Sequence, residues 1–450
     1  MAAQAPAKEP SVAFSGATLI DGTGAMPIED AVLVVAGGRI ASVGRSADVA
    51  VPPDTKRVEL SGRWIIPGLI DAHVHFFQSG GLFTRPDIVD LRAVRPYEVE
   101  SAAIRANIEA TLARYLASGV TSVVDVGGPM GNFEVRALAR RSPTAPRVAV
   151  AGPLLGTYAP PELSADDPPI IEIETPEQAR AEVRRQLVQG PDLIKIWFGF
   201  PDADLGPDLA WVRAAIEESQ AAGVPVVAHA TQLRVARAVV EAGADVLAHS
   251  IDDEPIDNAL LKLMREREVI YSTTLMVGPR YRAVFGRHLE LSGIERRLAD
   301  PEVIESLGEL DRLPRALLPA WVVRQPPLPM SPVIAGNLRR VQAAGITIAA
   351  GSDAGNIGTL HGPSLHRELE LMVKAGLSPM EALTAATGGG AAVMGRSDQL
   401  GALEPGKLAD FVVLDADPLA DIRNTTQIRA VIRDGQVFDP QAILEGLEED

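Results

Sequence analysis

The chain has 450 residues, 46% of them hydrophobic and 22% charged, so it is too long for one compact core and too apolar to be disordered. It contains no cysteine, which excludes disulfides, thiolate metal sites and cysteine nucleophiles. Its net charge of −17 argues against a nucleic acid or an anionic membrane as the main partner.

The first part of the chain, residues 1–66, is predicted to form short strands. Runs rich in Val, Ile and Leu at residues 13–21, 31–44 and 57–67 are separated by Gly and Pro, a pattern typical of hairpins. These strands are too few to bury one face of a sheet by themselves, so we expect them to pair with another part of the chain.

Between residues 67 and 395 short apolar runs alternate with stretches of helical period. Continuous apolar runs are typical of parallel strands that are buried on both faces. Eight runs of this kind occupy residues 65–76, 119–128, 147–153, 192–198, 224–230, 245–250, 269–275 and 347–353. Ser378, Pro379 and Glu381 have the spacing of a helix N-cap, N1 and N3. Eight strand–helix units predict an α/β fold, specifically a (β/α)8 TIM barrel.

The longest gap between predicted strands is an insertion at residues 276–332, after the seventh. It combines charged helical sequence at 289–311 with a proline-rich stretch at 325–332, and it carries Tyr281, Phe285 and Trp321. In a barrel this insertion would lie on the active-site face, as a lid or an oligomer contact. A surface excursion without a direct role is the other interpretation.

The end of the chain, residues 396–450, repeats the pattern of the beginning. Apolar runs at 409–416 and 428–438 predict strands, and Asp434-Gly435 predicts a hairpin turn. We therefore predict one small β-sandwich domain that is built from both the N-terminal and the C-terminal segments.

Six polar residues lie at the ends of the predicted barrel strands or inside them. His73 and His75 are separated by one residue on the first strand, so they point to the same face. Lys195 lies inside the fourth strand, where a charged amine is costly unless it is paired or modified. Because barrel strands present their carboxyl ends to one mouth, we expect the six side chains to converge. The set is His73, His75, Lys195, His229, His249 and Asp353.

This set of side chains has the chemistry of a two-metal site. Neutral imidazoles and a carboxylate suit Zn²⁺ or a similar divalent ion. Burial lowers the pKa of a lysine, and the free amine of Lys195 could react with CO2 to give N6-carboxylysine, which would bridge two metals. Asp353 could hold a metal-bridging hydroxide, accept its proton and deliver it to a leaving nitrogen. For each histidine taken alone, a satisfied polar residue at a strand end is the competing interpretation.

Three motifs resemble those of the amidohydrolase superfamily. Residues 68–75 read GLIDAHVH, residues 351–355 read GSDAG, and residues 403–410 read LEPGKLAD. With the remaining three ligands in chain order between them, the resemblance covers nearly the whole chain. It implies a metal-dependent hydrolase with a (β/α)8 barrel and a flanking β-sandwich.

The resemblance also implies a role for each ligand. His73 and His75 would bind the more buried metal, and a second pair, His229 and His249, the more exposed one. Carboxylated Lys195 would bridge the two metals. Asp353 would be both a ligand and the acid–base group, and we expect the catalytic residues to be Asp353, His249 and His361.

The stretch 355–371, with His361-Gly362, is similar to the Xaa-Pro dipeptidase and N-acyl amino acid hydrolase branch of this superfamily. Lys195 separates the chain from single-metal members such as the imidazolonepropionase-like ones. We therefore predict hydrolysis of the amide bond of a dipeptide or N-acyl amino acid by attack of a metal-bridging hydroxide. The alternative substrates are a lactone, a carbamate or a cyclic amide. A non-catalytic relative that keeps the barrel for assembly would have lost ligands, and here all are present.

Candidate substrate contacts surround this set. Arg85, Arg280 or Arg282 could pair with a substrate carboxylate, together with Tyr281. His361 could equally cap the following helix, and His366 is expected on a helix surface. Trp197 is expected either in a pocket wall or in the barrel core. The candidate contacts are Phe76, Gln78, Trp197, Tyr281 and His361.

The sequence predicts a small amide or dipeptide as the partner, with no nucleic acid and no membrane, and the resemblance implies a homo-oligomer. No apolar run reaches the ~20 residues that a membrane-spanning helix needs. The first residues lack the basic and apolar regions of a signal peptide. We therefore expect a cytoplasmic protein, or a periplasmic or secreted one if a leader had been removed.

Overall fold

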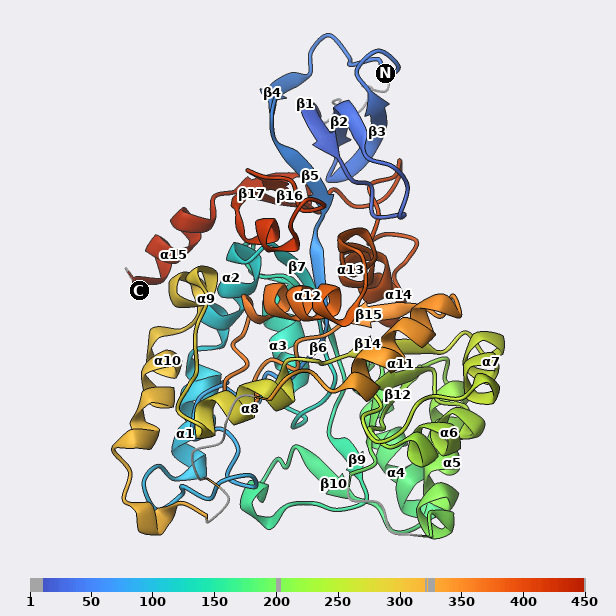
Figure 1. Cartoon of the computed structure of the whole chain (residues 1–450), viewed down its shortest axis with the longest axis vertical. Helices are drawn as coiled ribbons and strands as arrows, with labels where there is room; N and C mark the ends of the chain where they lie inside the picture. The colour runs from blue at the N-terminus through green and yellow to red at the C-terminus, as the bar shows by residue number, and fades with distance from the viewer. Residues whose placement is uncertain (1–10, 200–203, 320–321, 323–327, 449–450) are drawn as a thin grey trace, which may run out of the picture.

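A computed structural model of the chain describes residues 11–199, 204–319, 322 and 328–448. The strands among these residues form one eight-stranded sheet and two smaller sheets of seven and three strands. Helices surround the two smaller sheets, whose strands are all parallel, and the eight-stranded sheet lies at one end of the molecule (Figure 1).

The eight-stranded sheet, here called the terminal sheet, contains both ends of the chain. In the core of this sheet, the rings of Phe14 and Phe411 meet edge to face, with their centroids 5.0 Å apart. The Asp434-Gly435 turn joins the last two strands, and both residues have the positive φ that such a turn requires, 51° and 74°. The strands are β1 (Ser11–Leu19), β2 (Ile28–Ala36), β3 (Arg39–Arg45), β4 (Lys56–Glu59), β5 (Trp64–Pro67), β16 (Phe411–Leu414), β17 (Ile428–Arg433) and β18 (Gln436–Phe438).

The strand order of the terminal sheet, β18-β17-β16-β5-β1-β2-β3 with β4 beside β1, explains why neither end of the chain could form it alone. The antiparallel pair β16–β5 joins the two halves, with Val412 opposite Ile66. The prediction that both termini build one β-unit is therefore confirmed. Its division at residues 66 and 396 stays a prediction.

Each of the eight predicted apolar runs contains a strand. The strands are β6 (Leu69–Val74), β7 (Val120–Asp125), β8 (Arg147–Val150), β11 (Ile194–Trp197), β12 (Val226–His229), β13 (Val246–Ala248), β14 (Ile270–Thr273) and β15 (Ile348–Ala350). Two short strands were not predicted, β9 (Leu154–Gly156) and β10 (Ile170–Glu172), and they extend the seven-stranded sheet beyond β11.

Hydrogen bonds connect the two parallel sheets at two places. The N–H of Asp192, just before β11, donates to the carbonyl of Val150 at the end of β8, at 3.0 Å. At the second place, Asp353 N–H donates to His73 O at 2.8 Å, and His75 N–H donates to Ala354 O at 2.9 Å. The first and the last of the predicted strands therefore lie side by side.

Alternate residues of these strands enter two different apolar clusters. Val226 and Ala228 of β12 belong to the larger cluster, whereas Val227 between them belongs to a smaller one. This alternation follows from the period of two in a strand. It explains why the runs are continuously apolar, because both faces of each strand are covered.

Helices pack on the parallel strands, and several form where the sequence predicts them. Val212 and Ile216 are buried on one face of α5, and Ser378 caps α13 with Glu381 returning the hydrogen bond, as predicted. The helices are α1 (Tyr97–Ala106), α2 (Ile108–Ala117), α3 (Asn132–Ala139), α4 (Pro176–Leu187), α5 (Gly206–Ala221), α6 (Leu233–Ala242), α7 (Asn258–Glu266), α8 (Val277–Phe285), α9 (Gly293–Leu298), α10 (Pro301–Gly308), α11 (Pro332–Ala343), α12 (Ser364–Ala375), α13 (Pro379–Thr384), α14 (Gly390–Val393) and α15 (Pro440–Glu448). None of the helices in the described part of the chain has the length and hydropathy that crossing a bilayer would need.

The predicted insertion contains α8, α9 and α10. Its apolar side chains, among them Phe285 and Leu307, pack on Phe83 of the loop after β6 and on Leu360 of the loop after β15. The insertion therefore covers loops that leave the carboxyl ends of two strands. Its role as a lid or an oligomer contact stays a prediction, and Trp321 and residues 325–327 lie outside the described residues.

His366 was expected on a helix surface, and this prediction is wrong. The residue is only 2% exposed, because the short helical turn Ile422–Thr426 from the C-terminal segment packs on α12. Its Nδ1 is hydrogen-bonded to Thr425 Oγ1 at 2.9 Å, and its Nε2 lies 2.9 Å from Ser118 O. The helical period alone could not predict this second layer.

Candidate metal centre

The parallel registers bring the candidate ligands to one edge of the sheets. Trp197 lies opposite His229, and His229 lies opposite Ala248, so His249 follows at the same level. Both His249 and Asp353 adopt positive φ, 74° and 53°, directly beyond their strands. Left-handed backbone is uncommon for residues other than glycine and concentrates at functional sites.

Asp353 is the residue at which three histidines meet. Its Oδ1 lies 3.4 Å from His75 Nε2 and 3.6 Å from His73 Nε2, and its Oδ2 lies 3.8 Å from His249 Nδ1. One ligand atom from each of His73, His249 and Asp353 can be chosen so that all lie within 4.8 Å of one another. These separations are those of groups that could share a cation.

The fourth histidine joins this group through ring contacts. The ring centroids of His229 and His249 are 4.3 Å apart, and those of His249 and His73 are 4.8 Å apart. His73 and His75 are separated by 5.3 Å. The four rings therefore form one continuous cluster, which places together histidines that the sequence separates by as many as 176 positions, from His73 to His249.

Several buried polar atoms of the cluster have no hydrogen-bond partner among the residues that the structure describes. They are both ring nitrogens of His73, Lys195 Nζ and Asp353 Oδ1. Lys195 is only 1% exposed. Buried polar groups are nearly always paired, and a cluster of unpaired ones indicates that a bound ion completes it. Nitrogen and carboxylate donors also suit a divalent metal, so the residues present fit such an ion.

Burial sets the protonation of the cluster. It lowers the pKa of His75 and of His229 to about 3, and it holds the pKa of His73 and His249 well below the usual value. All four imidazoles are therefore neutral near pH 7, which is the form that binds a metal.

Burial also shifts the pKa values of Lys195 and Asp353, in opposite directions. It lowers the pKa of Lys195, with the Asp353 carboxylate opposing the shift, and it raises the pKa of Asp353, with the Lys195 charge opposing. A lysine with a lowered pKa presents more free amine at neutral pH. A carboxyl with a raised pKa accepts a proton more readily.

Hydrogen bonds outside the cluster orient two of the rings. His75 Nδ1 donates to the carbonyl of Gly127 at 2.7 Å, which leaves the lone pair of Nε2 facing Asp353. His249 Nδ1 lies 2.7 Å from Thr274 Oγ1, which leaves Nε2 of that ring available as a metal ligand. Partners of this kind set the tautomer of a metal-binding histidine.

Replacement of Thr274 by Val is expected to lower metal affinity by about 10- to 100-fold, because the hydroxyl that orients His249 is lost while the shape is kept. Metal titration of the purified variant measures the change. Thr425→Val, which removes the partner of the distant His366, is the control and should bind metal as the wild type does. Unchanged affinity in Thr274→Val would contradict the orienting role.

Three buried carboxylates behind the ligands were not predicted from the sequence. Asp71 accepts from Ser352 Oγ at 2.5 Å and from Ser352 N–H at 2.9 Å, next to Asp353. Asp125 accepts from the N–H of Gly127, whose carbonyl binds His75. Burial raises the pKa of Asp71 to about 7 and that of Asp125 well above its usual value.

The third of these carboxylates is Glu368 on α12. It accepts from Thr273 Oγ1 at 2.7 Å and from the N–H groups of Leu275 and Met276 at 2.8 and 3.0 Å. It thus holds the side chain before Thr274 and the backbone after it, and burial raises the pKa of Glu368 to about 7. Asp71 alone had a usable signal in the sequence, because it shares the strand face of His73 and His75.

Among the candidate substrate contacts, Phe76 lies away from the ligands. Its ring packs on Tyr115 and on His361, with centroids 5.9 and 5.7 Å apart. Phe77 instead lies beside the cluster, with its ring 5.6 Å from that of His75. Phe77 also lines a cleft of about 860 Å³ between α1 and α3.

His361 uses both ring nitrogens within the protein. Nδ1 lies 2.8 Å from the Tyr115 hydroxyl, and Nε2 lies 2.7 Å from the carbonyl of Gln78. This arrangement favours a structural role, and the catalytic role of His361 stays a prediction. Gln78 is buried, and its Oε1 has no partner in the described part of the chain.

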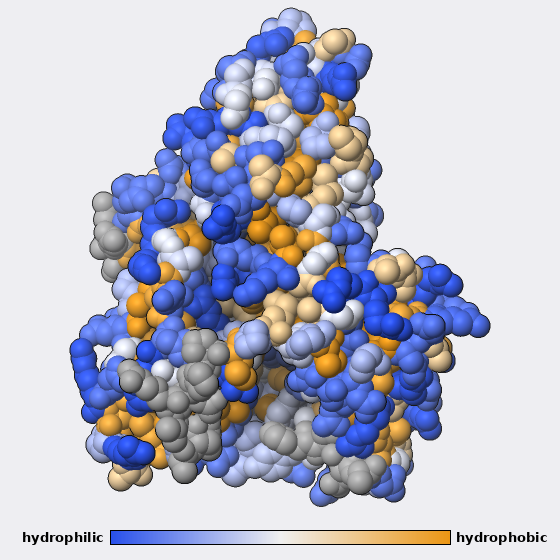
Figure 2. Space-filling view, viewed as in Figure 1, coloured by the Kyte–Doolittle hydropathy of each residue, from blue (hydrophilic) through white to orange (hydrophobic). Residues whose placement is uncertain are grey.

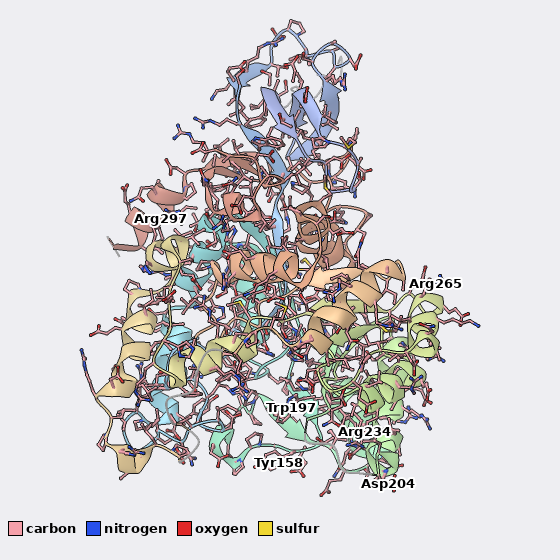
Figure 3. All side chains as sticks on the ribbon, in the orientation of Figure 1. Tyr158, Trp197, Asp204, Arg234, Arg265 and Arg297 are labelled. Carbon is pink, nitrogen blue, oxygen red and sulfur yellow. The ribbon has the colours of Figure 1, made fainter. Side chains whose placement is uncertain are left out.

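Trp197 lies beside the cluster, and Tyr281 is bonded to the loop that follows Asp353. The Trp197 ring meets that of His229 at 6.4 Å, and Figure 3 labels this residue low in the centre of the view. The Tyr281 hydroxyl donates to Asn356 Oδ1 at 2.7 Å, three residues beyond Asp353. In the same orientation, Figure 2 shows the lower half of this face hollowed between the helices on the left and those on the right.

The chain is similar to known proteins along most of its length. Residues 64–438 match the model of the amidohydrolase family. An imidazolonepropionase of Rhizorhabdus wittichii is 28% identical over 429 residues, which cover 89% of this chain and 92% of that protein. A solved structure from Bifidobacterium longum, designated a prolidase, has a TM-score of 0.70 at 26% identity over 98% of this chain and 100% of that chain. Phenylurea hydrolase B has a TM-score of 0.69 at 26% identity, covering 97% and 98%.

Proposed function

We propose, since this chain belongs to the amidohydrolase family, that it is a metal-dependent hydrolase of a carbon–nitrogen bond, the amide bond of a dipeptide or N-acyl amino acid. The observation that carries the proposal is the cluster of buried donors without partners around Asp353. The similarity to a structure designated a prolidase supports a peptide-like substrate.

The two parallel sheets are, in this proposal, one closed (β/α)8 barrel with the terminal sheet as its flanking β-sandwich. The hydrogen bonds between the loop after β15 and β6 support closure, because they join the first strand to the last. The two apolar clusters support it as well, since a barrel has an interior and an outer layer.

The residues that would hold the metals follow from the cluster. His73 and His75 would bind one ion and His229 and His249 the other, most suitably zinc, with N6-carboxylated Lys195 between them and Asp353 as a further ligand. When bound, the two ions would supply an acidified water and would polarise the scissile carbonyl.

Asp353 would move the proton of the reaction. Its buried carboxylate accepts a proton from the attacking water and then releases it to the leaving nitrogen, which must be protonated before it can depart. The raised pKa of Asp353 suits both steps. The rings of Trp197 and Phe77, which contact His229 and His75, would limit access of other water to this volume.

Hydrolysis of a lactone, a carbamate or a cyclic amide on the same centre is the second candidate function. The relatives named imidazolonepropionase favour the cyclic amide among these substrates. The buried Lys195 favours the first candidate, because the resemblance noted in the sequence associates this lysine with two-metal members. Oligomeric state and cytoplasmic location stay predictions.

Removal of metal tests this function. After dialysis against a chelator, activity is expected to fall to background and to return on addition of Zn²⁺, because the ion supplies the acidified water. The measurement is the rate of amide hydrolysis on a panel of Xaa-Pro dipeptides, N-acyl amino acids, lactones and hydantoins, together with the metal content.

Two histidine variants provide the comparison. His229→Ala should lose metal, whereas His288→Ala, on the insertion beyond α8, should retain it. Protein that contains no metal and stays inert on the whole panel when metal is supplied would contradict the proposal. A preference for lactones or hydantoins would select the second candidate.

A further inference from the structure

A cation whose side chain is only 16% exposed lies beside the proposed centre and has no role in the reaction described above. Arg85, on the loop after β6, donates to the Asp87 carboxylate through Nε at 2.8 Å and through Nη2 at 2.6 Å. Its Nη1 donates to Asn356 Oδ1 and, at 3.3 Å, to the Tyr281 hydroxyl. Three segments that are far apart in the sequence therefore meet at one guanidinium.

This cation is connected to Asp353 through a single side chain. Asn356 accepts from Arg85 through Oδ1, and its Nδ2 donates to the carbonyl of Asp353 at 3.2 Å.

A second pair on the same loop shows what distinguishes Arg85. Arg92 binds Asp90 with the same two-bond geometry, at 2.8 and 2.7 Å. The side chains of that pair are 40% and 51% exposed, whereas those of Arg85 and Asp87 are 16% and 7% exposed. A buried ion pair contributes little net stability, because the loss of hydration offsets the attraction. Stability alone therefore does not explain why Arg85 is buried.

The structure also separates Arg85 from Arg280, another candidate carboxylate partner in the sequence. Arg280 is paired with the buried carboxylate of Glu295, and its Nη1 donates to the carbonyl of Glu290 at 3.3 Å. Its guanidinium is thus committed to the segment around α9. Arg85, by contrast, has one N–H on Nη2 that meets no acceptor in the described ranges, and its 3.3 Å bond to Tyr281 is its weakest.

We propose that Arg85, together with the Tyr281 hydroxyl, forms the subsite for the free carboxylate of the substrate. The enzyme then selects N-acyl amino acids and dipeptides over neutral amides, ureas and lactones. The proposal rests on the proposed amide hydrolysis, in which Asp353 protonates the leaving nitrogen. In an amino acid leaving group the carboxylate is two bonds from that nitrogen, so a cation held on the Asp353 loop lies on the side where the carboxylate must bind. A guanidinium edge pairs with a carboxylate through two parallel hydrogen bonds.

The test compares a charged and a neutral substrate of the same shape, N-acetylphenylalanine and N-acetylphenylalaninamide, with release of acetate as the readout. Wild-type kcat/KM is expected to be about 10- to 100-fold higher for the carboxylate, the effect of charge-assisted hydrogen bonds. Arg85→Gln/Asp87→Asn removes both charges, so that neither is left buried alone. This double variant should lose the preference, because its KM rises more for the carboxylate than for the amide. Tyr281→Phe should lose part of the preference for the carboxylate.

The matched control is Arg92→Gln/Asp90→Asn, which removes the exposed pair and should behave as the wild type does. Equal wild-type kcat/KM on the two compounds, or an equal loss on both in the Arg85 variant, would overturn the subsite. Calorimetric binding of the same compounds separates the two proposals. Carboxylate-selective binding that the Arg85 variant loses, without any hydrolysis, would support the subsite and overturn the amide hydrolysis. Hydrolysis without carboxylate selectivity would support the amide hydrolysis and overturn the subsite. If neither hydrolysis nor carboxylate-selective binding is observed, both proposals are overturned.

Discussion

Replacement of Asp353 by Asn is expected to lower kcat by about 10²- to 10⁴-fold while leaving the fold and the bound metal largely intact. The amide keeps an oxygen toward the histidines, but it cannot accept the proton of the attacking water. Asn also tolerates the positive φ of 53° at this position, so the backbone bonds to His73 and Thr359 should persist. Steady-state rates, metal content and urea denaturation measure the three effects.

A matched substitution controls for the backbone. Asp30 also has a positive φ, 46°, but it lies at the exposed start of a hairpin in the terminal sheet. Asp30→Asn should therefore leave kcat unchanged. We expect the free energy of unfolding of Asp353→Asn to stay within about 1 kcal/mol of the wild type. Wild-type activity in Asp353→Asn would refute the proton-transfer role.

Replacement of Lys195 by Met is expected to lower activity by about 10²- to 10⁴-fold, because Met cannot supply the anionic bridge that we propose for carboxylated Lys195. Stabilisation of transition-state charge by metals amounts to several kcal/mol, and each 1.36 kcal/mol corresponds to a factor of ten. Met has a similar length to Lys and needs no hydrogen bond. Since Lys195 is only 1% exposed, the free energy of unfolding should not fall. Turnover, metal content and urea denaturation are the measurements.

Lys374→Met provides the control for loss of a lysine. Lys374 is an exposed residue in the last turn of α12, and its replacement should change neither metal content nor rate. Native mass spectrometry of the wild type should show one added carbon dioxide that Lys195→Met lacks. Full metal content and activity in Lys195→Met, or an unmodified amine in the active wild type, would contradict the bridging role.

The sequence alone was sufficient to predict the strands of the eight apolar runs and to select six candidate ligands, because both depend on local pattern. Strands buried on both faces require unbroken apolar runs, and all eight runs contain strands. Alternation along a strand directs His73 and His75 to the same face. The strand-pairing partner of the N-terminal segment was predictable for a similar reason, since each end of the chain has too few strands to cover a sheet face.

The residues that support the centre were decided only by the tertiary structure. Glu368 reaches the end of β14 from a helix 92 to 95 positions away, and Arg85 meets Asn356 across 271 positions. Loop conformation and the packing of one layer on another set such contacts, and neither follows a period in the sequence. The same non-local packing buries His366 under the C-terminal segment and places Phe77, rather than Phe76, beside His75.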